Sequence, residues 1–174
     1  MEIRIIKLDA CVSEQQQKAL SQILADSVAD GASISFMLPF SYDEASLFWS
    51  KSVLPEVMAG NRLLFGALRG DELLGTVQLI TDMPPNQPHR CEVAKMIVHP
   101  RARRLGIGRS LMNHALEQAR LLGKTLVTLD TKTGDVAEPL YASLGFEVAG
   151  IIPDYAWDSN GQAKHSTTYM YQRL

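Results

Sequence analysis

The sequence predicts one α/β domain spanning residues 1–174, with a mixed, mostly antiparallel sheet of about seven strands flanked by four helices. Three observations predict this class. The length of 174 residues favours a single domain with one ample core. Apolar residues alternate in some segments and recur at helical spacing in others. A hairpin signal in the first half and a strand–helix–strand run in the second require both antiparallel and parallel strand pairing.

The N-terminal part predicts a short strand and then a helix. Residues 2–7 alternate loosely between polar and apolar side chains, as a strand does. Ser13 and Gln16 have the spacing of a capping box, which begins the helix. Gly31 ends it, because glycine adopts the left-handed conformation that commonly follows a helix.

An apolar connector of no clear period, residues 31–40, leads to a second predicted helix. Ser41 and Glu44 form another capping box, and apolar residues continue at helical spacing until Gly60. We therefore expect one uninterrupted helix over this stretch.

Three apolar strands follow in the middle of the chain. Residues 62–68 and 72–80 are joined by Arg69-Gly70-Asp71, which is a hairpin signal. The proline-rich segment 81–88 is a loop, and residues 91–98 form the third strand.

The C-terminal part alternates helices and strands. We expect an amphipathic helix from Ile107 to Leu122, a strand over residues 125–129 that is buried on both faces, and a helix over residues 136–144. The chain then forms a strand over residues 146–152, a long loop over residues 154–165 and a last strand over residues 167–174. The predicted order is β-α-α-β-β-β-α-β-α-β-β.

Charge and composition exclude several classes of function. The net charge is −2, which gives no support for binding to nucleic acid or to an anionic membrane. No apolar run approaches the ~20 residues of a membrane helix, and the N-terminus lacks the pattern of a signal peptide. Cys11 and Cys91 show no metal-ligand spacing, so we expect no metal and a reduced, cytoplasmic compartment.

The segment Arg103-x-x-Gly106-x-Gly108 is the most informative motif, because it lies between a predicted strand and a predicted helix. Glycines let consecutive backbone N–H groups turn toward an anion, and the helix adds its unpaired amides and dipole. Further arginines supply full charges, at Arg101, Arg104 and Arg109. The motif predicts a diphosphate-binding turn. A dinucleotide-binding fold is disfavoured because Leu111 stands where a third glycine belongs.

The Arg103-x-x-Gly106-x-Gly108 motif resembles the acetyl-CoA-binding signature of the GNAT N-acetyltransferases. Ala137-x-x-x-Tyr141-x-x-x-Gly145-Phe146 resembles their second signature, and the likeness covers residues 62–174 best. The chain is most similar to the tabtoxin-resistance acetyltransferases, through Gly31-Ala32-Ser33, Phe36-Met37, Glu92-Val93, Lys95, Leu129-Asp130-Thr131, Gly134 and Val136-Ala137-Glu138. Many GNAT members carry Asn at the position of Gly134. This chain departs from that pattern, and the tabtoxin-resistance type resembles it in having no Asn there.

The resemblance implies acetyl-CoA (CoA) as the cofactor and an acyltransferase reaction. It assigns the backbone of the strand before the motif to the pantetheine arm and the motif itself to the diphosphate. The implied cofactor-binding residues are Met96, Ile97, Val98, Arg103, Arg104, Leu105, Gly106, Ile107, Gly108, Arg109, Ser110, Gly134 and Ala137.

Three side chains are the expected catalytic residues. An attacking ammonium must lose a proton, and a carboxylate accepts it. Glu92, at the head of an apolar strand, and Asp130, at the end of the next, are both candidates for this base. Tyr141 would be the general acid that protonates the leaving thiolate. Cys91 has no histidine in its motif, so we favour direct transfer over an acyl-cysteine. His99 and His165 are expected to be solvated loop histidines.

The acceptor site is expected between the early helices and the last strands. Its candidate residues are Phe36, Glu92, Asp130, Tyr155 and Trp157. The resemblance suggests a primary amine on a small antibiotic, toxin or amino-acid-like molecule, and hence an antibiotic-resistance function. The alternatives are a protein or peptide amine as acceptor, and a non-catalytic acyl-CoA-binding regulatory module. A homodimer is consistent with family habit.

Overall fold

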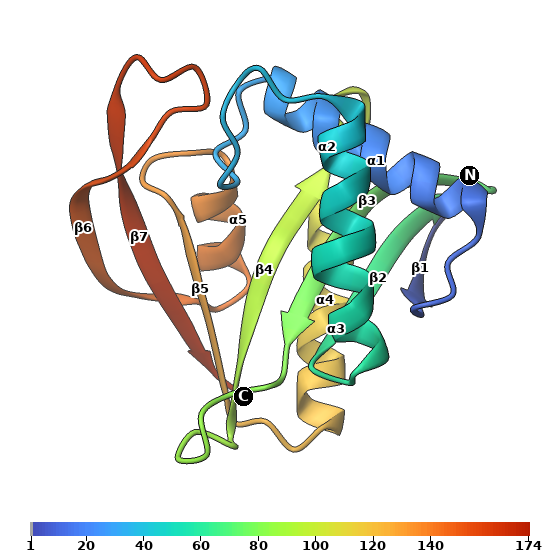
Figure 1. Ribbon diagram of the computed structural model, residues 1–174. Helices are drawn as coiled ribbons and strands as arrows, with labels where there is room; N and C mark the ends of the chain where they lie inside the picture. Colours follow the sequence, from blue (N-terminus) through green and yellow to red (C-terminus); the bar gives the residue numbers. More distant parts are fainter. Residues whose placement is uncertain (1) are drawn as a thin grey trace.

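The computed structural model describes residues 2–174 and contains one seven-stranded sheet with helices on both faces (Figure 1). The strand order is β1-β2-β3-β4-β5-β7-β6, and only β4 and β5 pair in parallel. The predicted mixed, mostly antiparallel sheet is confirmed. The strands are β1 (Ile3–Leu8), β2 (Arg62–Arg69), β3 (Glu72–Ile80), β4 (Arg90–Val98), β5 (Leu126–Lys132), β6 (Glu147–Trp157) and β7 (Lys164–Arg173). The helices are α1 (Glu14–Ala29), α2 (Tyr42–Leu47), α3 (Leu54–Met58), α4 (Ile107–Leu121) and α5 (Ala137–Ser143).

The second predicted helix is interrupted by a π-helical segment, Phe48–Val53, so α2 and α3 are its two ends. Pro55 follows this segment and has no backbone N–H to donate to the preceding turn, which favours a local change of hydrogen-bond pattern. The capping boxes at Ser13 and Ser41 are both formed. Trp49 is fully buried, and its Nε1 donates to the Leu20 carbonyl at 3.0 Å, which fixes this helical segment on α1.

Two apolar clusters hold the helices on opposite faces of the sheet. On one face, α4 contributes Leu111 and Met112 to a cluster with side chains of β2 to β5. On the other face, α1 and the helical stretch from α2 to α3 pack on β2, β3 and the end of β4. Figure 1 shows these helices on either side of β2 to β4, whereas β6 and β7 extend beyond them.

The neighbouring strands β4 and β5 separate along their length. They pair only at Arg90↔Leu126, Cys91↔Val127 and Glu92↔Thr128. Beyond these positions the two strands diverge, as Figure 1 shows. A β-bulge in β4 accompanies the separation: Lys95 has a φ of +48°, and the register against β3 shifts at this point.

The separation changes the environment that the sequence predicts for β5. We expected both faces to be covered, but only Val127 and Leu129 are buried, and Asp130 is exposed. Asp130 instead lines an open space between β5 and β4. Residues 125–129 are almost all apolar or β-branched. Such a run does not show whether both faces of the strand are covered or whether one of them borders an open space.

The predicted loop over residues 154–165 is also wrong in its extent. β6 continues to Trp157 and β7 starts at Lys164, so the connecting turn is residues 158–163. Pro153 and Asp154 resemble loop residues because they occupy an irregularity in the pairing of β6, where Asp154 has a φ of +51°. In residues 2–174, no helix is long and apolar enough to cross a membrane.

Candidate active site: a cleft between two diverging strands

A cleft of about 1000 Å³ fills the space between β4 and β5. Glu92 to Val98 of β4 form one wall and Leu129 to Lys132 of β5 the other. The turn before α4 closes one end with Arg103, Arg104 and residues 106–109, and α5 adds Tyr141. The α1–α2 loop, residues 30–41, and the end of β6 cover the opposite part. The cleft therefore brings together segments that are far apart in the sequence.

The β4 wall offers unpaired backbone to a ligand. Because β5 has diverged, residues 93–98 have no partner strand on that side. Met96, Ile97 and Val98 all line the cleft. An edge of this kind binds an extended, amide-containing chain as an additional strand.

The turn before α4 has the geometry of an anion-binding site. Gly106 has a φ of +78° and precedes α4 without any side-chain cap, so the first backbone N–H groups of the helix stay available. A Cβ on Gly108 would lie 3.2 Å from Leu140 Cδ2 and 3.5 Å from Met96 Sδ. Glycine thus keeps the first turn of α4 close to β4 and α5, and this turn is suited to a phosphate group.

The four arginines of the motif do different things. Arg104 and Arg109 line the cleft, and Arg109 Nη2 also donates to Ser143 Oγ at 2.8 Å. Arg103 lines the cleft and forms an ion pair with Asp30. Arg101 points away, because it forms an ion pair with Glu72 at the end of the sheet and takes no part in the cleft wall. The local positive charge is therefore smaller than the sequence pattern suggests.

Three of the predicted cofactor-binding residues lie outside the cleft lining. Leu105 is half exposed on the turn. Ser110 donates its hydroxyl to the Gly106 carbonyl at 3.3 Å, within the helix. Gly134 donates its backbone N–H to Glu138 Oε2 at 2.6 Å. Ile107 and Ala137, by contrast, both line the cleft.

Glu92 stands at the point where β4 and β5 part. Its Oε2 lies 3.3 Å from Arg90 Nη1, which also donates to Thr128 Oγ1 at 2.8 Å. The side chain is 41% exposed. The sequence predicted an apolar environment for this carboxylate, but the structure places a guanidinium beside it. The cause is strand alternation: Arg90 and Glu92 are two residues apart and share one face of β4.

Asp130 lies on the opposite wall, at the end of β5. Its Oδ2 accepts a hydrogen bond from Thr167 Oγ1 at 3.0 Å, and its strand partner on β7 is Tyr169. The carboxylate is exposed to the cleft. Glu92 and Asp130 therefore form a pair of acidic groups facing the same cavity from different strands.

Tyr141 is buried on α5, with 6% of its surface exposed, and it lines the cleft. Burial raises the pKa of its phenol well above the ordinary value, and the negative charges of Asp130 and Asp135 raise it further. The hydroxyl therefore stays protonated at neutral pH. A protonated phenol in this position can donate a proton or a hydrogen bond.

The α1–α2 loop is held over the cleft from β4. Lys95 Nζ donates to Ser35 Oγ at 3.1 Å and lies 5.7 Å from the centre of the Phe36 ring. The Phe36 ring packs against Phe40 and Phe48, at centroid distances of 4.6 Å and 5.1 Å. Burial lowers the pKa of Lys95, and the negative charge of Asp130 partly offsets this decrease. Within the described chain its ammonium pairs with no carboxylate.

Tyr155 and Trp157 lie on the β6 side of the cleft. The hydroxyls of Tyr155 and Tyr169 are 2.9 Å apart, and this hydrogen bond raises the pKa of Tyr169 to about 12. Trp157 has Lys164 Nζ 5.2 Å from its ring centre. The candidate acceptor residues Tyr155 and Trp157 thus lie on one side of the cleft, and Phe36 lies on the α1–α2 loop.

Comparison with known proteins decides the family. The sequence model described as the acetyltransferase (GNAT) family matches residues 30–146. This chain belongs to the GNAT family. Its fold is similar to that of an N-acetyltransferase from Staphylococcus aureus Mu50, with 15% identity, a TM-score of 0.80 and 99% coverage of both chains.

Two other solved structures have the same fold as this GNAT enzyme. One is a ribosomal-protein-alanine N-acetyltransferase from Brucella melitensis, with 21% identity, a TM-score of 0.78 and 100% coverage of both chains. The other, from Salmonella typhimurium, is described with its cofactor acetyl-CoA. It shares 19% identity at a TM-score of 0.78, over 99% of this chain and 94% of that one.

This GNAT protein is an acetyl-CoA-dependent N-acetyltransferase, and the chemistry of its cleft fits that cofactor. The turn at Gly106 and Gly108 suits the diphosphate, and the unpaired edge of β4 suits the amide-containing pantetheine arm. The two features lie in one continuous cleft.

Several residues of this GNAT site are not evident from the sequence motifs. Arg90, Lys95, Thr167 and Tyr169 contact the predicted residues but were not predicted as site residues. Alternation offers a partial signal for β7, because Thr167 and Tyr169 are two residues apart and face the same side. Nothing in the sequence pattern indicates the positive φ of Lys95 that turns its side chain toward the α1–α2 loop.

Proposed function

We propose that this GNAT enzyme transfers the acetyl group of acetyl-CoA directly to a primary amine of a small molecule. The closure of the acceptor part of the cleft carries this proposal. The α1–α2 loop is tied to β4 by Lys95 and to the β6–β7 turn by the Leu38 N–H, which donates to the Ser159 carbonyl at 2.7 Å. Met37 also packs beside Gly161 of that turn. An opening covered in this way favours a compact acceptor over a protein segment.

The donor would bind through the features that precede α4. The thioester supplies the activated acetyl group, and the chain supplies its orientation. Backbone amides near Ile97 and Val98 that face the unpaired edge of β4 would stabilise the negative charge that develops on the carbonyl oxygen. Gly106, Gly108, Arg104 and Arg109 would hold the diphosphate.

The two carboxylates would prepare the acceptor. An amine enters as an ammonium, and two acidic groups on facing walls attract it. One carboxylate, Glu92 or Asp130, removes the proton while the other orients the amine. Tyr141 would donate the proton that the leaving thiolate requires, since its phenol remains protonated.

Lys95 supports an amino-acid-like acceptor. Its ammonium is partly buried and lines the cleft, and among residues 2–174 it makes one hydrogen bond, to a neutral hydroxyl. Since a lysine can donate three hydrogen bonds, it can also receive a carboxylate from the acceptor. A molecule that carries both an amine and a carboxylate would satisfy Lys95 on one side and the acidic pair on the other. The resemblance to the tabtoxin-resistance group, with an antibiotic-resistance role, is consistent with such an acceptor.

Two other features support a homodimer and a cytoplasmic location for this enzyme. The edge strand β6 exposes Val148, Ile151 and Ile152, and a second copy of the chain could cover them in a homodimer. Cys11 and Cys91 are both free thiols, which is consistent with the reducing cytoplasm. Light scattering at several protein concentrations would test the dimer.

A peptide or protein amine is the second candidate acceptor, and one experiment separates the two. Thiol release from acetyl-CoA is measured against amino acids, small amines without a carboxylate, and peptides with free N-termini. Release that is fastest with amino-acid-like amines would support the proposal. Release confined to peptides would overturn it in favour of the second candidate, and binding of acetyl-CoA without release to any amine would leave a regulatory role.

A further inference from the structure

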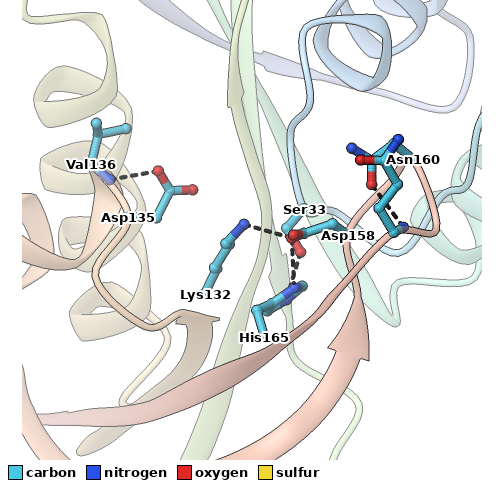
Figure 2. A network of polar contacts seen from close by, with 8 residues as sticks. Ser33, Lys132, Asp135, Val136, Asp158, Asn160 and His165 are labelled. Atoms are coloured by element: carbon cyan, nitrogen blue, oxygen red, sulfur yellow. Dashed lines mark hydrogen bonds and ion pairs between the residues drawn. The ribbon is translucent and has the colours of Figure 1, made fainter.

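Ser33, His165 and Asp158 form a hydrogen-bonded chain beside the cleft (Figure 2). Ser33 Oγ lies 2.8 Å from His165 Nε2, and His165 Nδ1 lies 3.0 Å from Asp158 Oδ1. The serine comes from the α1–α2 loop, the histidine from β7 and the aspartate from the β6–β7 turn. The sequence predicts a solvated loop histidine at position 165, but the His165 side chain is only 10% exposed.

The three residues have the arrangement of an activated serine: the hydroxyl contacts one imidazole nitrogen, and a carboxylate contacts the other. A carboxylate at Nδ1 fixes the imidazole tautomer and leaves Nε2 free to accept the hydroxyl proton. Asp158 also accepts a hydrogen bond from Lys132 Nζ at 2.6 Å, and this contact holds the pKa of its carboxyl below the usual range. Asp158 therefore remains an anion that accepts the hydrogen bond from His165 Nδ1 and orients the ring.

The location of the serine gives this chain access to an acyl group. Ser33 and His165 both line the same cleft as Glu92, Asp130 and Tyr141. The serine hydroxyl is not the only contact that holds the α1–α2 loop. The Leu38 N–H and Lys95 already tie that loop to the β6–β7 turn and to β4. The Lys95 ammonium is a cation on the same loop contact, with the sign needed to stabilise an oxyanion.

We propose that Ser33 is a second acyl acceptor in this cleft, activated by His165 and Asp158, and that it gives the protein an acetyl-ester and acetyl-thioester hydrolase activity when no amine is bound. Ser33 Oγ bonds to the acetyl carbon, the carbon–sulfur bond breaks, and His165 passes the serine proton to the leaving thiolate. Water then attacks the Ser33 ester, His165 takes a proton from that water, and it gives the proton to the serine oxygen as the carbon–oxygen bond of the ester breaks. The net reaction consumes one acetyl-CoA and one water and yields acetate, free CoA and one proton.

The nucleophile and the base of this activity, Ser33 and His165, differ from the groups proposed to catalyse amine transfer, so the two activities can be tested apart. The protein is incubated without an amine, either with acetyl-CoA or with p-nitrophenyl acetate, which needs no CoA-binding turn. Intact-mass and peptide analysis should find one acetyl group on Ser33, removable by hydroxylamine because it is an ester. Amine-free release should fall about 100-fold or more in Ser33→Ala and in His165→Asn.

Matched variants separate chemistry from structure. Ser166→Ala removes a hydroxyl beside His165 that does not line the cleft, and the ester should still form on Ser33. Ser33→Cys keeps a nucleophile and should accumulate an acetyl-thioester. Equal unfolding midpoints for these variants and wild type would show that Ser33→Ala is not merely unfolded. Absence of any adduct with both reagents, or release that survives Ser33→Ala and His165→Asn, would overturn the proposal whether or not the protein acetylates amines.

Discussion

Glu92 and Thr128 are the last partners at which β4 and β5 are joined, and the cleft begins at this pair. Asp130 lies two residues beyond Thr128 and therefore points to the same face of β5. The register thus places one carboxylate at the junction of the two strands and the other on the separated wall. Both acidic groups therefore line one cleft, and under the proposed function they would attract the ammonium of the acceptor.

The first prediction concerns these carboxylates. Glu92→Gln and Asp130→Asn should both retain acetyl-CoA binding. Loss of the proposed base should lower kcat/KM by about 100-fold or more, because general-base catalysis contributes this much. Loss of the base should mainly lower kcat, whereas loss of the orienting carboxylate should mainly raise the KM for the amine. Steady-state kinetics with varied amine concentration would assign each role.

A suitable control for both variants is Glu147→Gln. Glu147 accepts a hydrogen bond from the Tyr171 hydroxyl at 3.1 Å and does not line the cleft. It should leave kcat and KM unchanged. If Glu92→Gln and Asp130→Asn behave like this control, neither carboxylate is the base.

The second prediction is that Tyr141→Phe lowers kcat while acetyl-CoA still binds. Burial raises the pKa of the Tyr141 phenol, so the wild-type hydroxyl can donate its proton at all pH values below the ordinary pKa of about 10. The phenylalanine keeps the aromatic contact with Phe146 but has no proton to give. Rapid-quench and calorimetric measurements would separate the chemical step from binding, and an unchanged kcat would exclude this acid.

The same pKa shift predicts an effect on stability. The folded state favours the neutral phenol, so its contribution is complete below the unfolded pKa of about 10 and is lost as the pH rises above that value. Tyr141→Phe should therefore lose less stability than wild type between neutral and strongly alkaline pH. Urea unfolding at both pH values would measure this difference.

The third prediction concerns the turn before α4. Gly108→Val places its side chain against Leu140 and Met96, where even a Cβ has close contacts. The first turn of α4 must then move away from β4, and the Kd for acetyl-CoA should rise about tenfold or more, which corresponds to ~1.4 kcal/mol. Gly150→Val is the control, because a Cβ there meets no atom within 4 Å. Isothermal titration with acetyl-CoA would measure both dissociation constants. Equal binding by Gly108→Val and Gly150→Val would contradict the assignment of this turn to the diphosphate.

The sequence predicts most of the fold because its signals are local. The two capping boxes, the Arg69-Gly70-Asp71 hairpin and the glycine motif each depend on a few neighbouring residues. The site depends instead on the separation of β4 and β5, which is set by pairing across the sheet. The contacts of Lys95 with Ser35 and of Ser33 with His165 join segments that no periodic pattern connects.

The fourth prediction tests the proposed amino-acid-like acceptor. Lys95→Met keeps a long apolar side chain beside Phe36 but removes the ammonium. The KM should rise about tenfold for amines that carry a carboxylate, and it should change little for amines that lack one, because only the former lose an ion pair. If both classes of amine are affected equally, Lys95 acts by holding the α1–α2 loop rather than by binding the acceptor.

The last prediction concerns the thiols. Burial raises the pKa of Cys91 to about 11, although the charges of Lys124 and Arg90 oppose the shift. Cys91 packs in the cluster under α4 rather than in the cleft, and the exposed cysteine is Cys11. Because the thiolate is the reactive form, iodoacetamide at pH 8 should modify Cys11 in the native protein and leave Cys91 intact.

Unfolding in urea should expose the second thiol and make both reactive. The neutral form of Cys91 is favoured by folding, so its contribution to stability is complete below the ordinary thiol pKa of about 8.5 and decreases as the pH rises toward 11. Cys91→Ala should retain amine acetylation, since direct transfer uses no acyl-cysteine. Acetylation of Cys91 by acetyl-CoA, together with loss of turnover in Cys91→Ala, would instead establish a route through this thiol.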